Sequence, residues 1–254
     1  MTETKKEKRR IVIPGEIVAS GEDYLPGDFT RKEGKDIIAQ RYGLAEGDRV
    51  IKIIPISGVY EPRRGNTVIG RVSDITFNGW IVEIGGPYGA FLSLMECPRF
   101  INKNDIAEFA NIGDLFCAKI FTVKRNSADL TLKSRGLGKL EGGRVIKINP
   151  HKVPRVIGKE GSMVMMIKEA TGCNIIVGQN GLVWIEGEPE SEILAEETVK
   201  KIEEESHTAG LTDNIKKFLE KKTGKKIEPR IMTEPARNTD YQPEPADTTE
   251  ARGE

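Results

Sequence analysis

The stretch Val156–Cys173 reads VIGKEGSMVMMIKEATGC: a short apolar lead-in, a Gly-Lys-Glu-Gly loop, and a run with helical spacing. Four apolar residues of this run fall at i, i+3, i+4 and i+7 and predict a helix with one apolar side: Met163, Met166, Ile167 and Ala170. We expect Ser162 to cap this helix and Gly172 to end it. The glycines allow a close approach of another backbone, and a helix N-terminus offers free N–H groups. This loop therefore suits the phosphates of a nucleic-acid strand.

The residues around the loop predict a complete βααββα unit. A lone GxxG sequence is weak evidence, because any tight turn between helices can contain it. Here it stands between the first two helices of the unit, and the turn between the last two strands reads Gly178-Gln179-Asn180-Gly181. The predicted strands are 144–148, 173–177 and 182–186, and the predicted helices are 151–157, 163–171 and 190–205.

This order resembles a type I KH domain, a family that grips single-stranded RNA or DNA with its GxxG loop against the strand backbone. The resemblance implies that the loop binds RNA, and we include two basic residues of the preceding helix among the candidates. Glu160 departs from the family pattern, which usually has no acidic residue in this loop, and its carboxylate repels phosphate. The positive charge of Lys159 compensates in part. The candidate RNA-binding residues of this unit are Lys152, Arg155, Gly158, Lys159 and Gly161.

Length and composition allow one large domain or two to three small ones, since the chain has 254 residues, 37% hydrophobic and 31% charged. No apolar run approaches the about 20 residues of a membrane span. Residues 1–10 carry charges throughout and no signal-peptide core, so we expect a cytoplasmic protein without membrane association. Three widely separated cysteines, Cys97, Cys117 and Cys173, predict buried reduced thiols rather than a disulfide or a metal site, and no cofactor is expected.

The charge of the chain is balanced overall but unevenly distributed. Lys and Arg number 39, as do Asp and Glu, so bulk attraction to nucleic acid is not expected. Residues 124–168, however, contain eleven Lys or Arg and three Asp or Glu. Any single lysine here can be an ordinary solvated surface residue, but the whole zone predicts a local phosphate-binding face.

The segment before the KH-like unit predicts a small closed barrel of the OB type, because five short strands have a longer, helix-like connection (104–109) after the third. Its spacing resembles an S1 RNA-binding domain, a family in which aromatic rings stack on bases. Phe77 and Trp80 fall on the matching positions, Leu92 stands where the family often has His, and Lys124 and Arg125 are late basic residues. Either ring can instead be buried in the barrel core. For Phe77 we weigh base stacking and core packing equally, and for Trp80 we favour core packing. The predicted strands are 67–75, 77–84, 90–94, 115–124 and 128–133.

The fold class is therefore multidomain and mainly β, with an α+β part. Residues 1–63 should form a small β domain with strands in 11–18 and 49–56. It is too small for an independent hydrophobic core, so we expect it to pack on the next domain or on another protein. Residues 64–140 form the barrel and 141–206 the KH-like domain. Residues 207–227 carry a last helix with the apolar stripe Ile215, Phe218 and Leu219, and 228–254 a disordered, acidic, proline-rich tail.

A β segment, an S1-like barrel and a KH-like domain in this order resemble the RNA-binding cap subunit of the archaeal RNA exosome. The resemblance rests on IPGE at residues 13–16, on GVYEPRRGNTVIGRV at 58–72, and on the GxxG segment. It implies a non-catalytic protein that binds single-stranded, A-rich RNA. It further implies a trimer of caps on a hexameric ring of phosphorolytic RNase PH-like subunits, with room for a second cap paralogue. The N-terminal β segment would dock on the ring.

Two other function classes remain as alternatives. A free-standing S1/KH factor of transcription or translation often carries two KH units, and only one is found here. A nuclease in its own right would need paired carboxylates, a His/Cys cluster or a Ser-His-Asp arrangement, none of which the sequence suggests. The enzyme is the least favoured of the three.

Overall fold

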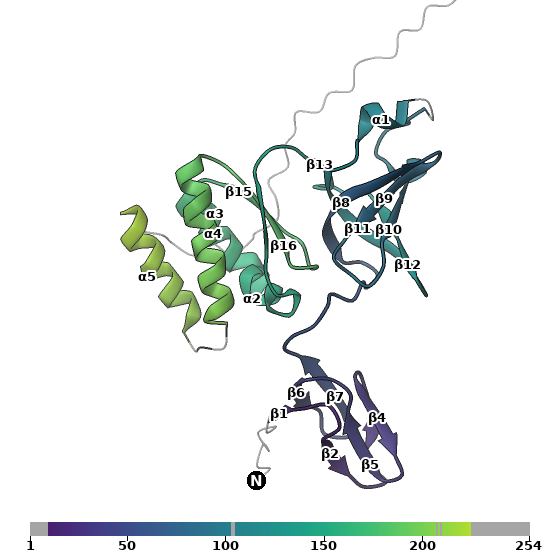
Figure 1. Cartoon of the computed structure of the whole chain (residues 1–254). Helices are drawn as coiled ribbons and strands as arrows, with labels where there is room; N and C mark the ends of the chain where they lie inside the picture. The colour runs from purple at the N-terminus through teal and green to yellow at the C-terminus, as the bar shows by residue number, and fades with distance from the viewer. Residues whose placement is uncertain (1–9, 103–104, 207, 209, 225–254) are drawn as a thin grey trace, which may run out of the picture.

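The structure is a computed structural model of the whole chain, and it describes residues 10–102, 105–206, 208 and 210–224. The predictions for the basic start (1–9) and for the tail (228–254) lie outside these residues. Figure 1 shows three groups of elements: N-terminal strands, a barrel, and a unit with most of the helices.

The N-terminal strands form two small sheets. One has the order β1-β6-β7-β3 and the other β2-β5-β4. The strands expected near residues 11–18 and 49–56 are present, but four short strands between them, β3 to β6, were not expected from the sequence. A buried cluster of Val12, Ala39, Ala45 and Ile53 gives this part a small core. The strands are β1 (Arg10–Val12), β2 (Ile17–Ser20), β3 (Leu25–Pro26), β4 (Thr30–Glu33), β5 (Asp36–Ala39), β6 (Gly43–Glu46) and β7 (Val50–Pro55).

The next five strands close into the predicted barrel. Strand β12 pairs in parallel with β10 and antiparallel with β11, and the second pairing closes the sheet β12-β10-β9-β8-β11. A sixth strand, β13, extends the sheet beside β11 and was not expected. The helix-like connection after the third strand is present as α1. The elements are β8 (Thr67–Thr76), β9 (Gly79–Glu83), β10 (Ala90–Ser93), η1 (Leu94–Glu96), α1 (Ile106–Phe109), β11 (Leu115–Lys124), β12 (Ser127–Thr131) and β13 (Gly138–Leu140).

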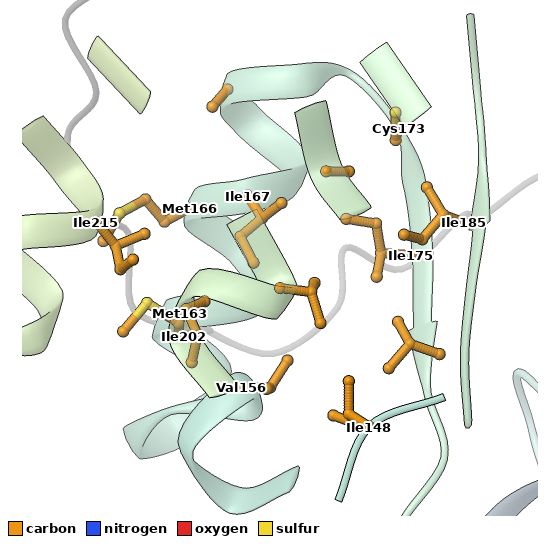
Figure 2. Packing of buried hydrophobic residues seen from close by; sticks show 14 of the residues in the cluster. Ile148, Val156, Met163, Met166, Ile167, Cys173, Ile175, Ile185, Ile202 and Ile215 are labelled. Atoms are coloured by element: carbon orange, nitrogen blue, oxygen red, sulfur yellow. The ribbon is translucent and has the colours of Figure 1, made fainter. Parts of the chain in front are cut away.

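The third group has the predicted βααββα order, with helices packed on the sheet β14-β16-β15. Figure 2 shows its core, in which Met163, Met166 and Ile167 pack with residues of both sheet and helices. All four residues predicted to form the apolar side of the GxxG helix are buried. The elements are β14 (Arg144–Lys147), η3 (Pro150–Lys152), α2 (Val153–Ile157), η4 (Lys159–Gly161), α3 (Ser162–Thr171), β15 (Asn174–Val177), β16 (Leu182–Glu186), α4 (Pro189–Glu204) and α5 (Leu211–Thr223).

Helix α5 adds to the core of this third group. Ile215 and Leu219 of its predicted apolar stripe are fully buried there, and Gly224 ends the helix in a left-handed conformation. Cys97, Cys117 and Cys173 are buried and unpaired, and burial raises the pKa of Cys97 and of Cys117 to about 11. Within the described residues, no helix is both long and apolar enough to cross a membrane.

The barrel and the third group are joined by the turn between β15 and β16. Asn180 is only 3% exposed, and its amide nitrogen donates to the carbonyl oxygens of Ile69 (2.6 Å) and Ile84 (2.9 Å). Its side-chain oxygen accepts from the Ile69 N–H at 3.2 Å. Beside it, the Gln179 N–H donates to the Thr67 carbonyl at 2.8 Å. The sequence predicted the turn but not this role, which fixes the position of one unit against the other.

Candidate nucleic-acid interface

The GxxG loop connects α2 to α3 through the short helix η4. Gly158 has a φ of 77°, and a Cβ placed there would lie 2.7 Å from the Cβ of Met163. Only glycine fits such a position without strain. Gly161, with a φ of 77°, occupies the N-cap position of α3, and Ser162 already has helical angles. The prediction that Ser162 caps the helix is therefore wrong, because the left-handed glycine completes the entry into the helix.

The charged side chains of the loop face solvent. Lys159 and Glu160 are exposed, and Arg155 is exposed on α2 just before them. In the described part of the chain, no ion pair is found for Arg155 or Lys159. Glu160 has a φ of 53°, unusual for a residue with a side chain. The loop thus presents two unpaired cations and one carboxylate around a bare glycine backbone.

Lys152 has a different role from the one expected. Its ammonium group donates to the Glu203 carbonyl oxygen at 2.9 Å, and the neighbouring Asn149 N–H donates to the Glu203 carboxylate at 2.7 Å. These bonds tie η3 to the end of α4. The structure therefore assigns Lys152 to the packing of the unit instead of leaving it free for phosphate.

The two aromatic candidates of the barrel lie in opposite environments. Phe77 is in the turn between β8 and β9 with 79% of its surface exposed, so its ring is open to a stacking partner. Trp80 is fully buried, packs 5.3 Å from the Phe109 ring centroid, and donates from Nε1 to the Ala110 carbonyl at 3.0 Å. A ring in the core cannot stack on an incoming base. This placement corrects the inclusion of Trp80 among the RNA-binding residues, in favour of its core alternative.

The basic residues at the β11–β12 hairpin are accessible but differ in pairing. Lys124 forms an ion pair with Asp129 at 2.8 Å, whereas Arg125 is exposed in the turn and has no ion pair within the described residues. Phe121 on the same strand is half exposed and was not singled out from the sequence. It follows the buried Ile120, so the alternation of inward and outward side chains along β11 turns it outward.

Comparisons with known proteins agree with this architecture. Residues 143–191 match the KH domain family, and this match includes the GxxG loop. The exosome complex component Rrp4 of Methanothermobacter thermautotrophicus is 40% identical over 96% of this chain and 78% of its own length. Rrp4 of Pyrococcus furiosus is 43% identical over 84% of this chain and 83% of its own, and that of Picrophilus torridus 40% identical over 86% and 95%.

A solved structure agrees with the sequence relatives. A crystal structure assigned provisionally to an exosome complex RNA-binding protein aligns with a TM-score of 0.59 and 36% identity. The alignment covers 65% of this chain and 97% of the other. By its sequence and its fold, the chain belongs to the family of the exosome complex component Rrp4.

Proposed function

We propose that this chain is an RNA-binding cap of the exosome: it holds single-stranded RNA for a degrading ring and leaves the cleavage to that ring. The observation that carries the proposal is the exposed GxxG loop with its two unpaired cations, Arg155 and Lys159, in a chain of the Rrp4 family. The chain is a non-catalytic subunit. Its described residues offer exposed cations and an exposed ring, which are the means of binding a strand.

The binding mechanism combines charge with stacking. Arg155, Lys159 and Arg125 contact phosphates, which makes the affinity fall as salt rises, because bound counterions are released. Phe77 stacks on a base without reading its identity. A strand held above the entrance of the ring has a high local concentration there, so the ring processes it more efficiently.

The finer parts of the proposal concern the assembly and the RNA. The cap sits in three copies on a hexameric RNase PH-like ring, which a second cap paralogue can share, and it favours A-rich tails. Its N-terminal strands dock on the ring. Several large apolar side chains of this part face solvent, among them Ile11, Ile13 and Ile17, each at least half exposed. Exposed apolar groups of this kind are typical of a surface that another protein covers.

Reconstitution tests this function. Fluorescence anisotropy with a labelled oligoadenylate should show salt-dependent binding by the purified chain, and gels should show intact RNA afterwards. With ring subunits added, the chain should co-elute and increase phosphate-dependent RNA turnover. RNA cleavage that survives repurification of the chain would refute its non-catalytic role. Binding without co-elution would favour a free-standing S1/KH factor.

A further inference from the structure

A cavity of about 620 Å³ lies between the N-terminal strands, the connection that leads into the barrel, and the KH-like unit. Strand β7 contributes Ile53 and Lys52, the connection to the barrel contributes Arg63, and the KH-like unit contributes Ile157 and Gly158. Its volume falls in the range of small-molecule sites. Because Gly158 is the first glycine of the GxxG loop, the cavity opens beside the loop that is the leading candidate for backbone binding.

The walls of the cavity are largely apolar. Ile53, Ile54 and Pro55 from β7 line it together with Val153, Pro154 and Ile157 from α2. Aliphatic and proline surfaces of this kind accept the flat face of a base. Two amide side chains, Asn66 and Gln179, also line the cavity, and they are bonded to each other. They can exchange that bond for the edge of a base.

The charges of the cavity leave one cation without a carboxylate. Lys52 pairs with Glu46 at 3.5 Å, and Glu61 pairs with Arg41. Arg63 has no ion pair in the described part of the chain. Its charge reaches the cavity wall: burial raises the pKa of Tyr60 to about 12 and Arg63 opposes that rise, while burial lowers the pKa of His151 and Arg63 adds to that lowering. An unpaired guanidinium at the edge of an apolar cavity is suited to a phosphate group.

Two carboxylates also line the cavity, and one of them, Glu61, is already paired with Arg41. Asp28 has no ion pair among the described residues, so its oxygens are free to accept hydrogen bonds. A ribose hydroxyl or an exocyclic amine of a base would satisfy it. Apolar walls, amides, one cation and one acceptor together match a nucleotide better than an apolar peptide.

We infer that this cavity binds one nucleotide unit, with the base between the apolar walls and the phosphate on Arg63. In an RNA strand the neighbouring backbone then lies on the GxxG loop. The inference rests on the proposed RNA-binding function and specifies where one nucleotide of the strand is held. A free nucleoside monophosphate has the same chemistry, so the test separates the two sources.

The test compares Arg63→Gln with Arg64→Gln in the full chain. Both residues are exposed arginines and adjacent in the sequence, so the two variants lose the same charge. Only Arg63 lines the cavity, so only R63Q removes a charge from the proposed site. With a labelled oligoadenylate, we expect R63Q to weaken binding about tenfold, as for the loss of a bond to a charged group. We expect R64Q to change it by about twofold or less, as for a surface charge that does not line the site. Thermal melting should be unchanged in both variants.

Titration with AMP, followed by NMR, tests whether the cavity binds free nucleotides as well as an RNA strand. Shifts that R63Q abolishes and R64Q leaves intact would assign the site to free nucleotides as well as to strands. Cross-linking gives a measurement that does not depend on a variant: an oligoadenylate with one 4-thiouridine should label the cavity wall within residues 150–158.

Three outcomes would overturn the cavity site while leaving RNA binding intact. R63Q and R64Q could weaken oligoadenylate binding equally. Cross-links could avoid the cavity wall. R63Q could impair co-elution with ring subunits without changing RNA affinity, which would make the cavity part of a protein interface. By contrast, failure of the unmodified chain to bind oligoadenylate at all would refute the proposed function itself.

Discussion

At the scale of single residues, Asn180 shows how a buried amide can hold two units together. Its side chain makes three hydrogen bonds to the backbone of Ile69 and Ile84 on the barrel. Each backbone group would remain buried without a partner if the amide were removed. Burial of unsatisfied polar groups is costly, so this residue matters more to the structure than its place in a turn suggests.

We predict that Asn180→Ala lowers the free energy of unfolding by about 2–3 kcal/mol, because buried polar groups of the barrel lose their partner. Urea unfolding followed by circular dichroism measures the change. Asn126→Ala is the control, since Asn126 is exposed in the β11–β12 turn. Equal stability of the two variants would mean that water replaces the amide.

His151 predicts a dependence of stability on pH. Its Nε2 is buried without a hydrogen-bond partner within the described residues. Burial, and next the charge of Arg41, hold the pKa of His151 below its usual value of 6.5, with Arg63 adding to this and Glu61 opposing it. As pH falls through 6.5, the unfolded chain takes up a proton that the folded chain does not. Stability therefore falls on acidification, down to the lower pKa of the folded chain.

The measurement is the urea midpoint at neutral pH and at about pH 5.5, above the range where ordinary carboxylates titrate. The free energy of unfolding should fall by less than about 1.4 kcal/mol per pH unit, since the side chain of His151 is only partly buried. His151→Gln should lose less than the unmodified chain over the same interval. His207→Gln, which changes the other histidine of the sequence, should behave like the unmodified chain.

At the scale of elements, the GxxG loop is the part whose function most needs a test. We predict that Lys159→Glu weakens oligoadenylate binding about tenfold or more, because it places a second carboxylate beside Glu160 in front of the phosphates. Lys217→Glu is the matched control, because it makes the same charge change at an exposed position of α5. If both variants bind equally well in anisotropy titrations, the loop serves only as architecture.

The elements also show what the sequence could and could not predict. The periodic helix α3 and the long strands β8 and β11 were predicted because each carries many apolar residues at regular spacing. Strands β3 to β6 and β13 were missed, since each has only two to four residues and takes its register from neighbours. Short strands depend on tertiary pairing, which no local pattern contains.

The candidate site divides in the same way. Gly158 and Gly161 lie in the tight loop that the sequence predicted, and both have positive φ angles, which glycine adopts from its own local properties. Lys152 and Asn180 acquire their roles from partners 51 and 111 residues away, Glu203 and Ile69. A lysine in a basic stretch or an asparagine in a turn carries no mark of such a partner.

At the scale of the whole molecule, the contacts between units keep the proposed binding surfaces at fixed spacing. The barrel is tied to the KH-like unit by the turn at Asn180, and the Asn149 amide donates to the Ile56 carbonyl at 3.1 Å, just after β7. An RNA strand that reaches two such surfaces loses its translational entropy only once, so the second contact forms at high effective concentration. Loss of either surface should then weaken a long RNA strongly.

We predict that Phe77→Ala weakens binding of a long oligoadenylate about tenfold, the effect of one lost stacking contact. Its stability should not change, because the ring is 79% exposed. Phe100→Ala is the control, since Phe100 is 89% exposed and tests whether any exposed ring has this effect. Anisotropy and thermal melting of both variants give the answer.

The length of the RNA adds a second criterion to the Phe77 prediction. An oligoadenylate too short to reach both the barrel and the GxxG loop should bind weakly to the unmodified chain and respond to only one of F77A and K159E. A long one should respond to both, because each contact raises the local concentration of the other. A long strand that is insensitive to F77A would place the RNA on the KH-like unit alone, with the barrel acting as a rigid support that holds the loop in position.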